Sequence, residues 1–199
     1  MGLKNTNIQY GSVAKWMHWI TALCFLCAYA AIYYVHWFTE YRSPEYREML
    51  LLHAMFGLTV GILFLPRLIW RLINVEPEHD PAPHWQHLAS KIAHWILYLF
   101  IFAMPLTGWL GFGMPAVNFY GLFDIPTLNG TGFFESSFAE NMGLVFEEWE
   151  KPIDFVHVNI LGRLFVWMLI LVHVAAALYH HFVQKDNTLR KMVPGMKPK

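Results

Sequence analysis

Histidine is the residue of this 199-residue chain whose placement suggests chemistry, because several of its 11 histidines interrupt long apolar stretches. Ionisable residues inside such stretches are rare and usually functional. Imidazole binds metals and exchanges protons near neutral pH, so these positions predict metal ligation or proton relay. The histidines concerned are His18, His53, His94, His157, His173 and His180.

These histidines fall at two depths. His53 and His157 lie near one end of their apolar stretches, and His18 and His173 lie toward the other end. A haem iron with two axial imidazoles needs histidines on facing helices at one depth. The sequence therefore predicts two haem sites, one formed by His53 with His157 and one by His18 with His173. The alternative is a haem-free membrane protein whose histidines satisfy one another.

The elements that must position these residues are indicated by the charges. Four uncharged gaps contain 24, 18, 32 and 21 residues, and a helix needs about 20 mainly apolar residues to cross the hydrocarbon core. Backbone groups in lipid must be satisfied within the segment, so the gaps predict helices. We expect an all-α integral membrane four-helix bundle, a single domain over residues 1–199. The expected helices are 13–37, 49–72, 90–112 and 153–183, with a long outer loop at 113–152.

The composition agrees with a membrane protein and excludes several other classes. Hydrophobic residues make up 56% of the chain and charged residues 14%, whereas a soluble domain carries about 25% charged residues. This excludes a disordered chain, a nucleic-acid partner and a disulfide-rich secreted scaffold. Cys24 and Cys27 are not followed by the histidine of a C-x-x-C-H motif, so covalent haem attachment is not expected.

Charge asymmetry predicts the orientation. The N-terminus, the second loop and the C-terminus together hold ten of the 14 Lys and Arg residues and four of the 14 acidic residues, and the other side holds the reverse. By the positive-inside rule, both termini are expected in the cytoplasm. The outer side, which includes the 113–152 loop, is then acidic. The aromatic residues of that loop are expected either on the membrane surface or in a lid packed over the bundle.

Two residues near the outer histidine pair suit a haem. Gly57 follows His53 by four residues on the same helix face, where the lack of a side chain would admit a porphyrin ring. The alternative for Gly57 is an ordinary small-residue helix contact. Arg163 lies inside the fourth apolar stretch, and a haem propionate would be its partner. The alternative for Arg163 is that the side chain extends to the interface.

The spacing within the fourth helix does not fit a regular α-helix. His157 and His173 are 16 residues apart, which is about 4.4 turns and would make the two side chains face nearly opposite ways. We therefore expect an irregular first turn or a π-bulge, which often marks functional sites. Otherwise His157 is not a ligand, although no other outer-side histidine is available in the third or fourth helix.

Several motifs, in their order and spacing, resemble the bacterial cytochrome b561 family of small four-helix, di-haem membrane proteins. The motifs are Tyr10-Gly11, Met17-His18-Trp19, Leu52-His53-Ala54, Arg67-Leu68-Ile69-Trp70-Arg71, Ala93-His94 and the run from His173 to His181 followed by Lys185-Asp186-Asn187-Thr188-Leu189. The resemblance implies two b-type haems, with His18 and His173 on the inner haem and His53 and His157 on the outer one. It also implies ubiquinone as acceptor, with His94 and His180 as candidates for a quinone or proton site.

The resemblance further implies electron transport in the bacterial inner (plasma) membrane. Electrons would pass from a periplasmic one-electron donor to ubiquinone, and superoxide is the donor in the best-defined activity of the family. An acidic outer side would repel superoxide, so local positive charge would be needed near its entry point. The alternative is a non-enzymatic membrane anchor and electron conduit for a separate dehydrogenase or periplasmic electron carrier, which the acidic loop would dock.

Overall fold

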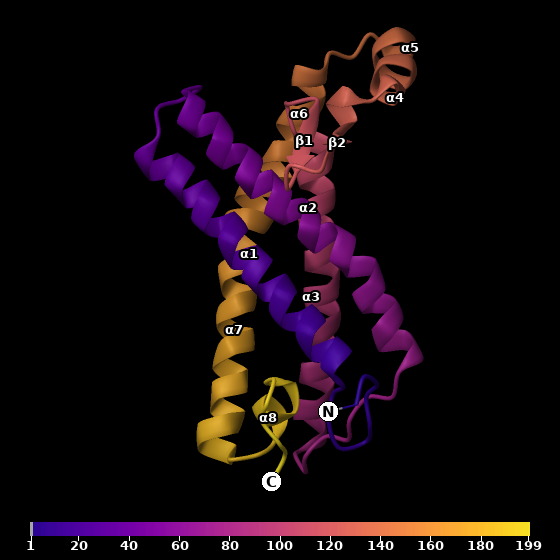
Figure 1. The fold of residues 1–199 in the computed structure, drawn as a ribbon, viewed down its shortest axis with the longest axis vertical. Helices are drawn as coiled ribbons and strands as arrows, with labels where there is room; N and C mark the ends of the chain where they lie inside the picture. The colour runs from indigo at the N-terminus through magenta and orange to yellow at the C-terminus, as the bar shows by residue number, and fades with distance from the viewer. Residues whose placement is uncertain (1) are drawn as a thin grey trace.

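Four long helical segments run side by side through the computed structural model, which describes residues 2–199 (Figure 1). Residue 1 of the expected domain lies outside the described residues. In chain order the elements are α1 (Ser12–Phe38), α2 (Pro44–Ile73), α3 (His84–Gly111), strands β1 (Ala116–Phe119) and β2 (Phe123–Pro126), η1 (Leu128–Gly130), α4 (Gly132–Phe134), η2 (Glu135–Ala139), α5 (Glu140–Met142), α6 (Phe146–Asp154), η3 (Phe155–Phe165), α7 (Val166–Tyr179), η4 (His180–Gln184) and α8 (Thr188–Met192).

Each expected helix coincides with one long helical segment, except that α3 ends at Gly111, one residue before the expected 112. This confirms the all-α membrane bundle. The segments α1, α2, α3 and the continuous Phe146–Gln184 are all long and apolar enough to cross a membrane. At every other boundary the observed helices extend beyond the expected bounds, because stretches without charge locate only the apolar part of a helix. The fourth segment, for example, begins seven residues before the expected 153 and includes Glu147, Glu148 and Lys151.

The early start of α2 has a local cause. Ser43 is the N-cap, and its hydroxyl accepts a hydrogen bond from the Tyr46 amide at 3.1 Å. Pro44 occupies the first helical position and Glu45 lies in the first turn. Serine at the cap, proline at the first position and an acid near the helix N-terminus all favour helix initiation. The helix therefore begins outside the apolar stretch.

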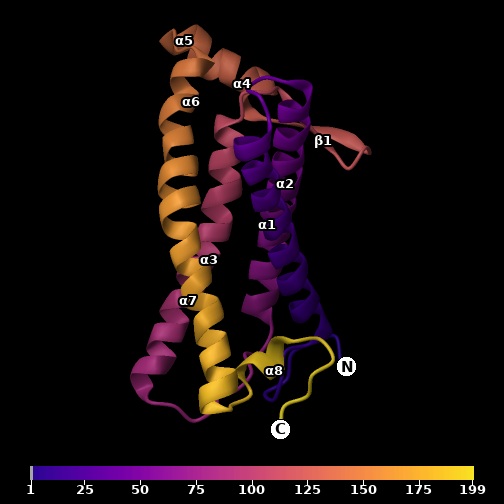
Figure 2. The same cartoon turned by 90° about the vertical axis from the view of Figure 1, so that its left-hand side faces the viewer.

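The bundle is held together by neighbouring segments. α1 packs on α2, α2 on α3, and α3 on α6 and η3 (Figure 2). Its buried centre contains Tyr29, Phe100, Met104 and Val166, drawn from three of the four long segments. Many other large apolar side chains face outward, as expected where lipid is the solvent. The N- and C-termini share one end of the bundle, which we call the termini end (Figure 1).

The opposite end, which we call the loop end, carries the 112–145 connection. It contains an antiparallel hairpin in which Ala116 pairs with Pro126 and Phe119 with Phe123. A second part packs four aromatic residues into a small cluster, in which ring centroids lie between 4.8 and 6.0 Å apart. The cluster contains Phe134, Phe138, Phe146 and Trp149. These four aromatic side chains therefore pack against one another.

Candidate functional site

The first histidine pair lies toward the loop end. His53 comes from α2 and His157 from η3, and their ring centroids are 6.2 Å apart with planes at 82°. The residues are separated by 104 positions in the sequence, so only the packing of the fourth segment against the bundle brings them together. Both side chains are partly buried.

Hydrogen bonds orient both rings of this pair. His53 Nδ1 lies 2.9 Å from the Ala28 carbonyl oxygen, which can only accept, so the proton is on Nδ1. His157 Nδ1 lies 3.0 Å from Thr107 Oγ1. The Thr107 hydroxyl donates to the Ala103 carbonyl at 2.8 Å, so its oxygen accepts the hydrogen bond from the His157 Nδ1–H. Each ring therefore has an unprotonated Nε2 that is free to bind a metal.

The unusual spacing of the fourth helix is explained by a π-helix. η3, residues Phe155–Phe165, has the wider π winding, and α7 follows it with ordinary winding. About half of the 16 steps from His157 to His173 lie in η3, at about 4.4 residues per turn when bonds run from i to i+5, and the rest lie in α7 at 3.6. The total is about four whole turns, so the two histidines share one face of the segment. This is the irregular-turn alternative expected from the sequence.

Glycines leave room beside the loop-end pair. A Cβ added at Gly108 would lie 3.1 Å from His157 Cε1, so α3 can approach this ring only because residue 108 lacks a side chain. A Cβ added at Gly57 would meet nothing within 4 Å. The open space at Gly57 suits a flat ligand better than a tight helix contact. Gly61 instead packs against Pro105, because a Cβ added at Gly61 would lie only 2.9 Å from Pro105 Cβ, as in a close helix contact.

The second cluster lies toward the termini end and contains three histidines. His173 of α7 is 6.2 Å from His18 of α1 and 6.1 Å from His94 of α3, measured between ring centroids. His94 Nδ1 lies 2.7 Å from the Ser90 carbonyl oxygen, so its proton is on Nδ1 and its Nε2 is free. The predicted partner of His173 is thus present, and His94 is an equally near neighbour.

Arg67 of α2 contacts the termini-end cluster directly. Its Nη2 lies 3.0 Å from His18 Nδ1 and donates to it, because guanidinium has no acceptor. The guanidinium also lies over the Tyr98 ring at 5.7 Å. Among residues 2–199 Arg67 has no carboxylate partner, whereas Arg71 is paired with Glu76 at 2.9 Å. The cluster therefore carries an uncompensated positive charge that suits an acidic ligand group.

Two predicted residues lie away from these clusters. Arg163 is exposed, and its Nη1 donates to Asn159 Oδ1 at 3.3 Å. His180 is bound to Asp186 at 2.5 Å beyond the end of α7. Burial alone would raise the pKa of the Asp186 carboxyl, but hydrogen bonds from His180 and Thr188 outweigh burial and hold this pKa below its ordinary value.

The geometry of both pairs fits a bis-histidine haem. Two metal–imidazole bonds of about 2 Å, with each ring centre about 1.1 Å beyond its nitrogen, separate the ring centroids by about 6 Å. The separations of 6.2 Å for His53–His157 and His18–His173 agree with this value. Among residues 2–199, no three His, Cys, Asp or Glu side chains are placed so that they could together hold a bare metal ion. A haem needs only two protein ligands because the porphyrin supplies the other four.

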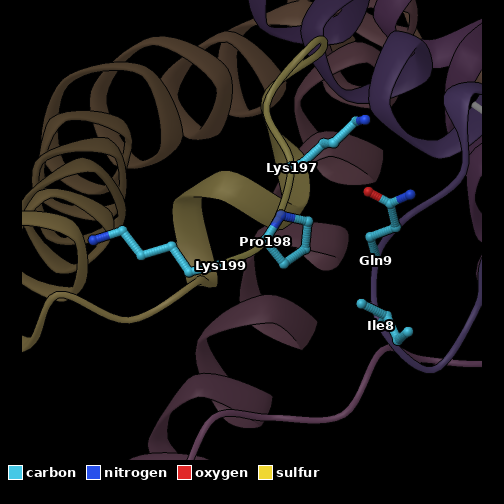
Figure 3. A pocket seen from close by; sticks show the side chains of 5 residues that line it. All are labelled: Ile8, Gln9, Lys197, Pro198 and Lys199. Atoms are coloured by element: carbon cyan, nitrogen blue, oxygen red, sulfur yellow. The ribbon is translucent and has the colours of Figure 1, made fainter.

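The C-terminal segment closes the termini end beneath the histidine cluster. Trp19 Nε1 donates to the Met192 carbonyl at 3.2 Å, and Lys191 Nζ lies 3.1 Å from Asp80 Oδ1. A pocket nearby is lined by residues of both chain ends, including Gln9 and Lys197 (Figure 3). Its lining contains none of the histidines, so it is separate from the candidate haem sites.

Three residues of the site were not predicted as such from the sequence. They are Thr107 and Gly108, which contact His157, and Arg67, which contacts His18. A signal for two of them exists in the spacing. Gly108 follows His94 by 14 residues, and Arg67 follows His53 by 14. Fourteen residues make about four turns, so each lies on the same helix face as a histidine.

Comparisons with known proteins cover nearly the whole chain. A sequence model of the family described as prokaryotic cytochrome b561 matches residues 9–195. The chain is 32% identical to cytochrome b561 homolog 1 of Escherichia coli (strain K12), over 95% of this chain and 99% of that one. It is 27% identical to cytochrome b561 homolog 2 of the same organism, over 97% and 95%. It is 23% identical to a probable superoxide oxidase CybB of Yersinia pestis, over 94% and 96%.

Proposed function

The chain belongs to the prokaryotic cytochrome b561 family, and from this premise we propose that it carries electrons across the bacterial inner membrane through two b-type haems. As a family member it is a membrane electron-transfer protein with b-type haem. The proposal adds the number of haems, their ligands and the direction of transfer. Electrons enter from a periplasmic one-electron donor and leave to ubiquinone.

One observation carries the proposal. Two histidine pairs, His53 with His157 and His18 with His173, have the same centroid separation at two depths of one bundle. One haem site would hold an electron at a single depth, whereas two sites at different depths form a path for electrons across the membrane. Each haem, when bound, supplies a one-electron redox centre whose potential depends on its ligands, burial and neighbouring hydrogen bonds.

The protein residues orient the ligands and balance charge. The Ala28 carbonyl and the Thr107 hydroxyl hold the Nδ1 protons of His53 and His157, so both rings present Nε2. At the other site Arg67 donates to His18 Nδ1, which places the His18 proton on Nε2. Iron could bind His18 through Nε2 only if the proton moved to Nδ1, and Arg67 would then have to leave His18. A haem propionate would be a suitable new partner for the Arg67 guanidinium. Arg163 is the corresponding predicted partner at the loop end.

Quinone reduction is assigned to the termini end. His94 lies beside His173, and its imidazole can donate or accept a proton there. His180 and its partner Asp186 would extend the proton route toward the aqueous phase. Ten of the 14 basic residues flank this end, so we assign it to the cytoplasm by the positive-inside rule. Quinone reduction would then take up cytoplasmic protons.

Superoxide is the donor that we propose for the loop end. The support is the similarity to a protein named probable superoxide oxidase. The loop side is acidic overall, so the anion needs a local positive region. Four basic residues of this side would form it, namely Arg42, Arg47, Lys151 and Arg163.

A second candidate function is favoured by the surface of α6. Glu147 and Glu148 are exposed in its first turn at the loop end. An exposed acidic helix of this kind suits docking of a basic periplasmic electron carrier. In that case the chain would be an electron conduit for a separate protein.

The purified protein in liposomes with ubiquinone distinguishes the two functions. Rapid haem reduction by superoxide, followed by reoxidation that depends on quinone, supports the enzyme. A protein that superoxide leaves oxidised, but that a basic carrier reduces, supports the conduit. The four-site variant Arg42→Gln, Arg47→Gln, Lys151→Gln and Arg163→Gln should slow reduction by superoxide and flatten its salt dependence. Unchanged rates in that variant would contradict the positive region.

A further inference from the structure

The β1–β2 hairpin leaves the bundle beside α2 with an uncharged, apolar tip. The strands project sideways from the helices at the loop end (Figure 2). The tip side chains of Tyr120, Leu122 and Phe123 are 46%, 77% and 55% exposed. Three large apolar side chains at one turn form a patch that needs a partner, because isolated exposure is common but contiguous exposure is not.

Tyr120 fixes this tip to α2. Its φ is 54° and that of Gly121 is 73°, so the turn has two positive φ angles in succession. A bulky residue in this region is strained and persists only where its surroundings hold it. The Tyr120 hydroxyl lies 2.9 Å from Thr59 Oγ1. Since the Thr59 hydroxyl donates its hydrogen bond to the Met55 carbonyl, Tyr120 is the donor in the bond between the two hydroxyls.

The attachment point lies deep within the membrane-spanning part of α2. Thr59 stands in the uncharged stretch between Glu48 and Arg67, eleven residues after Glu48. This is a rise of about 16 Å along the helix, compared with a hydrocarbon core about 30 Å thick. The phenol of Tyr120 therefore reaches below the head groups, and the neighbouring tip side chains lie at a similar level.

The backbone and the nearest charge set how far the hairpin can enter. At the tip, the Leu122 amide donates to the Phe119 carbonyl at 3.0 Å and the Gly121 amide to Asn118 Oδ1 at 2.8 Å. The outer edges of a two-stranded hairpin keep unpaired backbone groups, which hydrocarbon does not tolerate. Asp124, bound to Asn118 at 2.8 Å, is the first charge behind the tip. The strands must stay among the head groups while the tip enters the acyl region.

We propose that this hairpin tip is a membrane anchor whose partner is lipid acyl chain in the loop-side leaflet. Tyr120, Leu122 and Phe123 contact acyl chains below the head groups, at the level of Thr59 of α2. Asn118 and Asp124 remain at the head groups. β2 leads directly to the buried Leu128 at the base of the loop, so the anchor fixes the height of the loop above the loop-end histidines. The proposal does not depend on haem number or donor.

Site-directed spin labelling of the full chain in phosphatidylcholine vesicles tests this proposal. Leu122→Cys is labelled with a nitroxide in a background of Cys24→Ala and Cys27→Ala, and collisions with oxygen and with a water-soluble nickel complex are measured. Leu99→Cys on the outer face of α3 is the lipid control, and Glu140→Cys on α5 is the water control. Retention of the haem spectrum shows that each variant is folded.

The expected result is that the Leu122 label resembles the Leu99 label, with high oxygen and low nickel accessibility. A label at Asp124→Cys should be intermediate, and one at Phe123→Cys should repeat the Leu122 result. Nickel accessibility equal to that of Glu140 at both Leu122 and Phe123 would overturn the proposal, because the tip would then lie in water. Protection from both reagents, with spin–spin broadening between chains, would also overturn it by showing that a second copy covers the tip.

Discussion

Thr107→Val is the substitution that isolates the role of hydrogen bonding at the loop-end pair. Thr107 Oγ1 is 3.0 Å from His157 Nδ1 and accepts a hydrogen bond from it. Valine has nearly the shape of threonine but no acceptor, so the change removes the side-chain acceptor of the partly buried His157 N–H. It creates no cavity, and the histidine itself is unchanged.

The magnitude follows from this geometry. Leaving a buried donor without its acceptor costs about 1–3 kcal/mol. Removing the group that orients a metal-binding histidine lowers metal affinity by about 10–100-fold, which corresponds to about 1.4–2.8 kcal/mol. The two estimates agree, so we expect haem at the loop-end site to bind about 10–100-fold more weakly in Thr107→Val.

The assay is transfer of haem to apomyoglobin in a His173→Ala background. This background removes the histidine that both His18 and His94 approach, so the remaining haem reports on the loop-end site. Thr107→Ser is the matched control, because it keeps the hydroxyl and loses only a methyl group. If both variants retain haem as well as the His173→Ala background does, the Thr107 hydroxyl does not contribute to haem binding. If both lose haem faster to the same extent, packing and not the hydrogen bond holds His157.

Three further predictions concern other parts of the chain. Gly162→Ala should distort η3 and weaken haem binding at the loop-end pair, because its Cβ would lie 2.8 Å from the His157 carbonyl oxygen; haem titration measures this. His18→Ala should remove one haem and His94→Ala none, as counted by haem analysis, if His18 is the ligand. Asp186→Asn should loosen α8 at pH 7, as measured by hydrogen exchange. The difference from wild type should shrink as the pH falls below about 4, where the unfolded chain begins to bind the proton, and should vanish once the pH lies below the lowered pKa of the folded Asp186 carboxyl.

The controls for these predictions are specific. Gly132→Ala, where an added Cβ meets nothing within 4 Å, should leave haem binding unchanged. Loss of a haem in His94→Ala but not in His18→Ala would show that His94, not His18, is the partner of His173 on that haem. An Asp186→Asn effect that does not shrink at all between pH 5 and pH 3 would show that the carboxylate charge is not what stabilises α8.

The sequence was sufficient to predict the four membrane spans and the depth of each histidine. Both follow from one-dimensional properties, namely the uncharged gaps and the positions of His53 and His157 within them. The sixteen-residue spacing to His173 indicated either an irregular helix or that His157 is not a ligand, because a regular α-helix would place the two histidines on nearly opposite faces. The π-helix η3 is the structural solution.

Other features depend on contacts between segments that no periodicity specifies. Whether His173 lies nearer to His18 or to His94 depends on how α7 packs against α1 and α3, and the two separations are nearly equal. Arg67 was recognised as part of a motif, but its contact with His18 crosses from α2 to α1. The hairpin was also not predicted, because the apolar residues of the 113–152 loop show no clear strand alternation.

Haem stoichiometry in single-histidine variants is the sharpest test of two haem sites. We expect about two b-type haems per wild-type chain, and about one in either His157→Ala or His18→Ala, with distinct residual spectra because different sites remain. The double variant His157→Ala/His18→Ala should retain essentially none. One haem per wild-type chain would contradict two sites, and identical residual spectra in the two single variants would contradict one haem for each histidine pair.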